Sequence, residues 1–179
     1  MSSTYSSRAA ILCPGPSLAA VTEIGECSCA FAVNGACKSP LSWTHWICAD
    51  ARSVERHYPP AGGHNRRVWM PHDVSLHDRP RPDIIIRSYD LPSICRSIGW
   101  IRIQSVRKWT MLHACAILIG NGSTCIDIYG CDLSGDGYYA SPPNYSVIGG
   151  NRWAEQRKCL ERLTSLAAEH GIEIRRMSQ

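Results

Sequence analysis

The sequence lacks any apolar stretch of the length that crosses a bilayer, which takes about 18 residues or more. Residues 1–8 are polar and show no apolar signal segment followed by a small-residue cleavage site. There is also no Cys-x-x-Cys pair, so the common zinc-binding spacings are absent. Together these absences predict a cytoplasmic protein with no membrane span and no dedicated metal site.

What the sequence does have is ten cysteines, an even number that would suit a disulfide framework. A chain of 179 residues, however, buries a sizeable core without covalent cross-links. Several of the cysteines, such as Cys48 and Cys115, also fall inside apolar runs, where a thiol packs as a small hydrophobic group. We therefore expect reduced thiols that pack in the core, with no ligand or cross-linking role.

The composition is globular, with 44% hydrophobic and 19% charged residues, and it fits a single domain over residues 1–179. The net charge of +4 is unevenly distributed: residues 51–110 hold eleven Arg and Lys against five Asp and Glu, whereas residues 111–150 hold three Asp and no Arg or Lys. The basic residues are mostly arginines, which suit phosphate or carboxylate binding. A compositional bias or a solvated face explains the same pattern. A nucleic-acid partner is neither required nor excluded.

Short apolar runs alternate with helical segments along the chain. Strands are predicted at residues 8–13, 29–33, 43–49, 67–70, 83–87, 100–103, 124–129 and 172–175, and helices at 17–24, 51–58, 110–119 and 151–170. Outside its two strands, the proline-rich segment 59–100 is predicted to be variable and partly irregular. This alternation predicts an α/β fold, a Rossmann-like three-layer sandwich with a mostly parallel sheet.

In such sheets, ligands bind beyond the carboxyl ends of the strands, so the residues that follow each apolar run are the candidate site. The turn at Gly15, Pro16 and Ser17 follows the first strand and opens a predicted helix. A glycine that allows close approach, free N–H groups at a helix start and a serine hydroxyl together suit a phosphate. An ordinary strand-to-helix turn is the alternative.

Three further polar positions follow predicted strands. Asn34 and Gly35 come after the second strand, where the amide suits a base or a sugar, or simply forms a turn. Asp50 comes after the third strand, and Asp132 follows Gly130 after the strand at 124–129. Each carboxylate suits a ribose hydroxyl, a base or a metal ion, and each is equally well explained as a helix cap.

Taken in order, these turns resemble the motifs of a known group of transferases. Ile11–Leu18 resembles a GxGPSL element, Ala32–Ala36 and Ile47–Asp50 resemble the elements on the second and third strands, and Cys125–Asp132 resembles a hydrophobic strand followed by Gly-x-Asp. The group is a set of Rossmann-like transferases that includes bacterial sialyltransferase-like enzymes, a flagellin-glycosylation domain of unknown function, archaeal-type hydroxymethyl-dihydropterin pyrophosphokinases and small phage-encoded relatives. The resemblance covers residues 9–52 and 108–135. Pro14 stands where Asn or Ser is more familiar, and residues 59–100 have no counterpart.

The resemblance implies a nucleotide-binding transferase, which we interpret as a sialyltransferase-like glycosyltransferase that uses a nucleotide-sugar donor. Phosphate would be held by the turn at 15–17, and Asn34 would contact the nucleotide or the reacting group. Asp50 and Asp132 would contact the sugar, base or metal and are also candidate catalytic residues, and Gly35 and Gly130 would belong to the same nucleotide site. His72 and His77, with Asp73, are the candidate catalytic bases, and Arg66, Arg67, Arg79 and Arg81 are the candidate phosphate-balancing cations.

Two other functions stay open from the sequence. In a pyrophosphokinase of the hydroxymethyl-dihydropterin type, Mg²⁺ held by Asp50 or Asp132 would bridge the phosphates. In a phage-type protein that binds a nucleotide or metabolite without catalysis, the same turns would serve binding alone.

Overall fold

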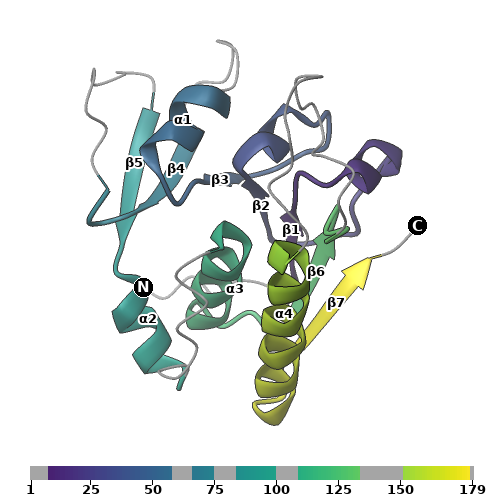
Figure 1. The fold of residues 1–179 in the computed structure, drawn as a ribbon, viewed down its shortest axis with the longest axis vertical. Coiled ribbons are helices and arrows are strands. Elements are labelled where there is room, and N and C mark those ends of the chain that lie inside the picture. Colours follow the sequence, from purple (N-terminus) through teal and green to yellow (C-terminus); the bar gives the residue numbers. More distant parts are fainter. Residues whose placement is uncertain (1–7, 58–65, 75–83, 100–108, 134–150, 178–179) are drawn as a thin grey trace.

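In the computed structural model, residues 8–57, 66–74, 84–99, 109–133 and 151–177 are described (Figure 1). Seven strands form one sheet in the order β5-β4-β3-β2-β1-β6-β7, and every neighbouring pair is parallel. The strands are β1 (Arg8–Leu12), β2 (Cys29–Val33), β3 (His45–Ile47), β4 (Arg66–Pro71), β5 (Ile84–Tyr89), β6 (Cys125–Tyr129) and β7 (Glu173–Met177).

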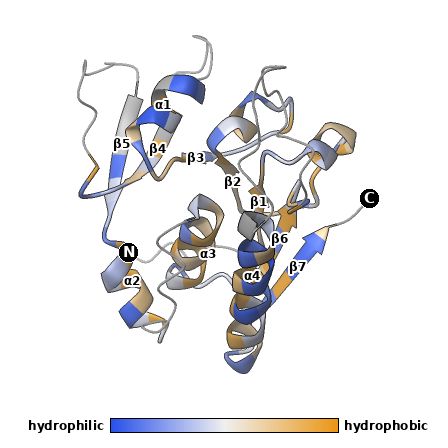
Figure 2. Cartoon of the chain, in the orientation of Figure 1, coloured by the Kyte–Doolittle hydropathy of each residue, from blue (hydrophilic) through white to orange (hydrophobic). Residues whose placement is uncertain are grey.

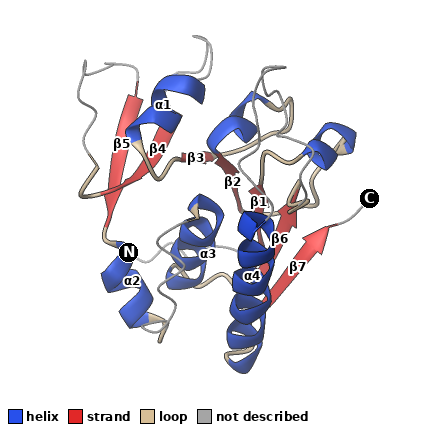
Figure 3. Cartoon of the chain, viewed as in Figure 1, coloured by secondary structure: helices blue, strands red, loops and turns tan. Residues whose placement is uncertain are grey.

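Helices connect the strands, as Figure 3 shows. They are the 3₁₀ helices η1 (Pro16–Ala20) and η2 (Asn34–Lys38) and the α-helices α1 (Ala51–His57), α2 (Leu91–Ser97), α3 (Thr110–Gly120) and α4 (Asn151–Glu169). The predicted α/β class and the Rossmann-like sandwich are therefore confirmed, and the sheet is parallel at every described pair of strands.

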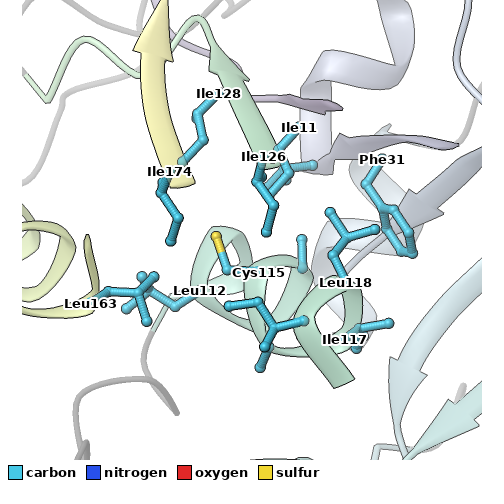
Figure 4. Packing of buried hydrophobic residues seen from close by; sticks show 14 of the residues in the cluster. Ile11, Phe31, Leu112, Cys115, Ile117, Leu118, Ile126, Ile128, Leu163 and Ile174 are labelled. Carbon is cyan, nitrogen blue, oxygen red and sulfur yellow. The ribbon is translucent and has the colours of Figure 1, made fainter. Parts of the chain in front are cut away.

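Two apolar clusters, one on each face of the sheet, form the three layers. Successive side chains of a strand point to opposite faces, so Ile11 and Leu12 belong to different clusters. Ile11 lies in the cluster that packs against α2, α3 and α4, which Figure 4 shows around Cys115 and Leu118. Leu12 lies in the other cluster, with Leu18 of η1.

Helix α3 is apolar on all sides, and every residue from Leu112 to Ile119 is buried (Figure 2). It packs against both the sheet and α2, which explains why it has no polar face. His113 is buried within it, and its Nδ1 lies 2.6 Å from the hydroxyl of Tyr89 at the end of β5. His113 is therefore a core residue that ties α3 to the sheet.

The order of the strands defines a switch point at β1. From β1 the chain adds β2, β3, β4 and β5 on one side, and it then crosses through α3 to place β6 on the other side of β1. The turns that follow β1 and β6 therefore leave the carboxyl edge next to each other and lead in opposite directions. In parallel sheets of this kind, such a point is the usual place for a ligand.

Two predicted elements differ from the structure. The helix expected at 17–24 is wrong in type and extent, because η1 ends at Ala20 and Val21 adopts an extended conformation. β-branched Val21 and Thr22 disfavour a helix. The Gly25 N–H also donates to the hydroxyl of Tyr129 at 3.2 Å, which holds the chain after η1 against β6.

Helix α2 lies in a segment that was expected to be irregular. Asp90 begins it by accepting from the Ser93 N–H at 3.3 Å, and Pro92 lies in its first turn, where a missing N–H has no cost. The predicted strand at 100–103 lies outside the described residues.

Asp127 of β6 carries a buried carboxylate between two arginines. One oxygen lies 2.7 Å from Arg8 of β1, and the other lies 2.6 Å from Arg175 of β7. The three side chains connect three adjacent strands on one face of the sheet.

Among the described residues, no helix combines the length and the apolar character that crossing a membrane requires.

Candidate functional site

The turns after β1 and β6 are joined through their backbones. The N–H of Cys13 donates to the carbonyl of Tyr129, and the N–H of Gly15 donates to the carbonyl of Gly130, both at 2.8 Å. A Cβ on Gly15 would overlap the Gly130 carbonyl oxygen and the Asp132 carboxylate. The close approach that Gly15 allows is therefore to the neighbouring turn, whereas the sequence had suggested an approach to a ligand.

Asp132 accepts a hydrogen bond from the first part of η1. Its Oδ2 lies 2.9 Å from the backbone nitrogen of Ser17. Pro16 has no N–H, so the Ser17 N–H is the donor that a phosphate at this turn would use, and here it faces a carboxylate. A phosphate would therefore have to displace Asp132, and the phosphate-holding role of residues 15–17 stays a prediction.

Asn34 lies at the end of β2 with an unusual backbone conformation. Its φ is +47°, in the left-handed region, and its carbonyl accepts from the indole N–H of Trp46 at 2.9 Å. The side-chain nitrogen lies 3.5 Å from Oγ1 of Thr110, the first residue of α3. The amide oxygen is buried and has no hydrogen-bond partner among the described residues. The fold thus leaves the side-chain amide oxygen of Asn34 without a donor, at a point between the end of β2 and the start of α3.

Asp50 is a helix cap in this structure. Its carboxylate accepts from the N–H of Ser53 at 2.7 Å and from the Ser53 hydroxyl at 2.9 Å, at the start of α1. This is the structural alternative that the sequence left open for Asp50. Its predicted contact with a ligand or metal remains a prediction.

His57, which the sequence reasoning missed, lies beside this edge at the end of α1. A Cβ built on Gly35 would lie 3.2 Å from His57 Nδ1 and 3.8 Å from Cβ of Pro14. Nδ1 is buried and has no hydrogen-bond partner among the described residues. Burial lowers the pKa of His57, and the nearby charges of Lys38 and Arg56 lower it further, which favours the neutral ring.

The predicted bases are not brought to the switch point. His72 follows β4, where its N–H donates to the Tyr89 carbonyl at 3.0 Å and its side chain is exposed. Asp73 follows it, also exposed. Strands β3 and β2 separate β4 from β1, so neither side chain lies in the turns after β1 and β6. His77 lies outside the described residues.

The arginines that were predicted to balance the phosphate charge are not found at the turns after β1 and β6 among the described residues. Arg66 and Arg67 begin β4, so their backbones lie at the amino edge of the parallel sheet, opposite the candidate site. Strand direction separates these backbones from the carboxyl edge, and the role of the two arginines with a phosphate stays a prediction. Arg79 and Arg81 lie outside the described residues. Lys38 of η2 is a cation on the correct edge, close enough to His57 to lower its pKa.

Metal ligands are not grouped in the part of the chain that is described: no set of three or more His, Cys, Asp or Glu side chains there is arranged to hold a metal ion. The carboxylates of Asp50 and Asp132 each accept from a backbone N–H, at Ser53 and Ser17. They would have to exchange these donors in order to bind Mg²⁺.

Comparisons with protein-family models, with curated proteins and with solved structures gave no significant match. The motif resemblance therefore rests on the residues of this chain alone.

Proposed function

We propose that this protein binds a nucleotide at the carboxyl edge of its sheet, beside the junction of β1 and β6, and transfers a group from it. The observation that carries the proposal is the buried amide oxygen of Asn34, which lacks a hydrogen-bond partner among the described residues. A buried acceptor is costly unless a donor reaches it. A sugar hydroxyl or the amino group of a base is such a donor, and switch points are common nucleotide sites.

The reaction class that we propose is glycosyl transfer from a nucleotide-sugar donor, in line with the motif resemblance. Such a reaction needs a base that accepts the proton of the acceptor hydroxyl and a cation that stabilises the leaving phosphate. His57 suits the first role because its lowered pKa favours the neutral imidazole, which can accept a proton. Lys38 suits the second, because it lies on the same edge.

The position of the phosphate decides the role of Asp132. If the phosphate binds the turn at 15–17, it takes the Ser17 N–H from Asp132 and meets the negative charge of that carboxylate. Asp132→Asn would then strengthen nucleotide binding. If Asp132 instead holds a ribose hydroxyl, the same substitution would weaken binding. The direction of the change therefore distinguishes the two placements.

The test is a thermal-shift screen with nucleoside mono-, di- and triphosphates and nucleotide sugars. A ligand at 100 times its Kd stabilises the folded state by about 2.7 kcal/mol, which is readily measured. Asn34→Ala should abolish the shift. The matched control is Asn121→Ala at the far end of α3, where the side chain bonds the Ile117 carbonyl at 2.8 Å, and this variant should keep the shift.

Four outcomes would contradict parts of the proposal. If no nucleotide or nucleotide sugar stabilises the protein, nucleotide binding itself is wrong. If a ligand shifts both variants equally, the site does not include Asn34. If a ligand binds without turnover on any acceptor, a non-catalytic binding protein is favoured, and turnover that EDTA abolishes favours the Mg²⁺-dependent pyrophosphokinase.

A further inference from the structure

Each of the two joined turns carries a cysteine. Cys13 is the first residue after β1, and Cys131 is the second residue after β6, with Gly130 between it and the strand. Both are free, both are more than nine-tenths buried, and both belong to the apolar cluster under α3 and α4. Although 118 positions separate them in the sequence, the fold places their side chains on the same face of adjacent strand ends.

Two glycines bring these turns together. Gly130 has a φ of +65°, which turns the chain back toward β1 just before Cys131. A side chain at Gly130 would overlap the carbonyl oxygen of Cys13 and would lie 2.8 Å from Cβ of Leu18. Gly15 similarly leaves room for the Gly130 carbonyl. Because neither glycine has a side chain, the two turns that carry the thiols lie in direct contact.

The thiols interact as donor and acceptor. A hydrogen bond with Cys13 lowers the pKa of Cys131, and the positive charge of Arg176 lowers it further. The same hydrogen bond, together with burial, raises the pKa of Cys13. The interaction therefore shifts the thiolate form toward Cys131 and the proton toward Cys13, although burial of Cys131 opposes the lowering of its pKa. Of two paired thiols, the one with the lower pKa supplies more of the nucleophilic thiolate.

We propose that Cys13 and Cys131 form a dithiol pair that a hydroperoxide, such as hydrogen peroxide, oxidises to a disulfide between the turns of β1 and β6. The Cys131 thiolate attacks one peroxide oxygen, the O–O bond breaks, and the departing hydroxide takes a proton to become water. The Cys13 sulfur then attacks the resulting sulfenic sulfur, forming the S–S bond as the S–O bond breaks. The Cys13 proton leaves with that oxygen as a second water, so two thiols and one peroxide give one disulfide and two waters.

This inference does not depend on the proposed function, because the cross-link is measured without any nucleotide. It also replaces the sequence-based expectation that these two thiols only pack. Cys115 offers a matched comparison, since it lies in the same cluster, its charge raises the pKa of Cys13, and the charge of Cys131 raises its own pKa. Burial raises the pKa of Cys115 well above the usual thiol range, which makes it a poor nucleophile.

The experiment treats the reduced full-length protein with a small excess of hydrogen peroxide at neutral pH. The reaction is stopped in acidic guanidinium, free thiols are alkylated, and the protein is digested with trypsin, Glu-C and Asp-N. These cleavages isolate Cys13 in residues 9–23 and Cys131 in residues 127–131, away from the other cysteines. We expect mass spectrometry to find these two peptides joined, and dithiothreitol to separate them.

Variants make the test specific. Cys115→Ser should keep the cross-link, whereas Cys13→Ser and Cys131→Ser should lose it, with circular dichroism confirming that each variant is folded. The wild-type peptide map decides the outcome even where a serine variant fails to fold. The proposal is overturned if folded wild-type protein gives no cross-link, or if either cysteine pairs mainly with Cys115.

Discussion

The backbone N–H of Ser17 donates to the carboxylate of Asp132 at 2.9 Å, across 115 residues of chain. This bond closes the contact between the turns after β1 and β6. Asp132 thereby serves as the side-chain acceptor that η1 otherwise lacks, since Gly15 at its N-cap position has no side chain.

Removing this acceptor should destabilise the fold. We expect Asp132→Ala to lower the free energy of unfolding by about 1–2 kcal/mol, because a partly buried N–H loses its partner. Asp132→Asn keeps an oxygen acceptor and should lose less. Urea unfolding followed by circular dichroism measures both changes. Equal stability of Asp132→Ala and the wild type would mean that the bond contributes nothing.

The approach of the two turns should not tolerate a side chain at Gly15. Gly15→Ala places a methyl group against the Gly130 carbonyl, and we expect it to lower the free energy of unfolding by about 2 kcal/mol or more. Gly120→Ala, at the end of α3, is the control, because its Cβ would lie at an ordinary 3.4 Å from Ile94 Cγ2. If the two variants were equally stable in urea, the close approach at Gly15 would be incorrect.

The carboxylate of Asp127 should contribute more to stability than either of its arginine partners. Its side chain is 2% exposed, whereas those of Arg8 and Arg175 are 38% and 36% exposed and can turn to solvent when the carboxylate is removed. We expect Asp127→Ala to lower the urea midpoint more than Arg8→Gln or Arg175→Gln. Salt should weaken each single arginine pair only partly, since one partner is buried. A larger loss in Arg8→Gln than in Asp127→Ala would contradict this order.

His57 should make stability depend on pH in a defined window. Its pKa in the folded protein lies below the ordinary value of 6.5, so between these two values the unfolded chain binds more protons. Stability should therefore fall as the pH drops from about 6.5 toward the folded pKa, and it should be insensitive to His57 above that range.

Urea midpoints measured from pH 5 to pH 7.5 test this dependence. His57→Gln should flatten the decline in the window, and Lys38→Gln should reduce it, because the charge of Lys38 helps to lower the pKa of His57. The neighbouring Asp50 acts in the opposite direction, so Asp50→Asn should steepen the decline. An unchanged slope in His57→Gln would show that other groups cause it.

Much of the fold was predictable from local sequence, because most elements carry strong signals. Short buried runs such as Cys29–Val33 and Cys125–Tyr129 predict parallel strands, and the continuous apolar segment after Thr110 predicts a buried helix. Helix α2 was missed because its seven residues of mixed polarity are too few to show a periodic signal, although Asp90 and Pro92 are start signals that were available. The length of η1 depends on where Val21 and Gly25 pack, which is a tertiary property.

The candidate site was predictable only as a set of strand-end turns. The direction of a parallel strand already places the backbones of Arg66 and Arg67 at the amino edge, opposite these turns. The position of His57 beside Gly35 depends on how α1 returns over the sheet, which no local pattern records. The bond between Ser17 and Asp132 likewise depends on the pairing of β1 with β6.

The late position of β6 in the chain has a consequence for biosynthesis. Strands β1 to β5 leave the ribosome first and can pair as a growing sheet, but β1 remains an open edge until residue 129 has emerged. The turns after β1 and β6, with Ser17, Asp132 and the two thiols, therefore meet only after most of the chain has been made. A nascent chain that stops before β6 would expose the unpaired backbone of β1, so chaperone binding should be strongest at that stage of synthesis.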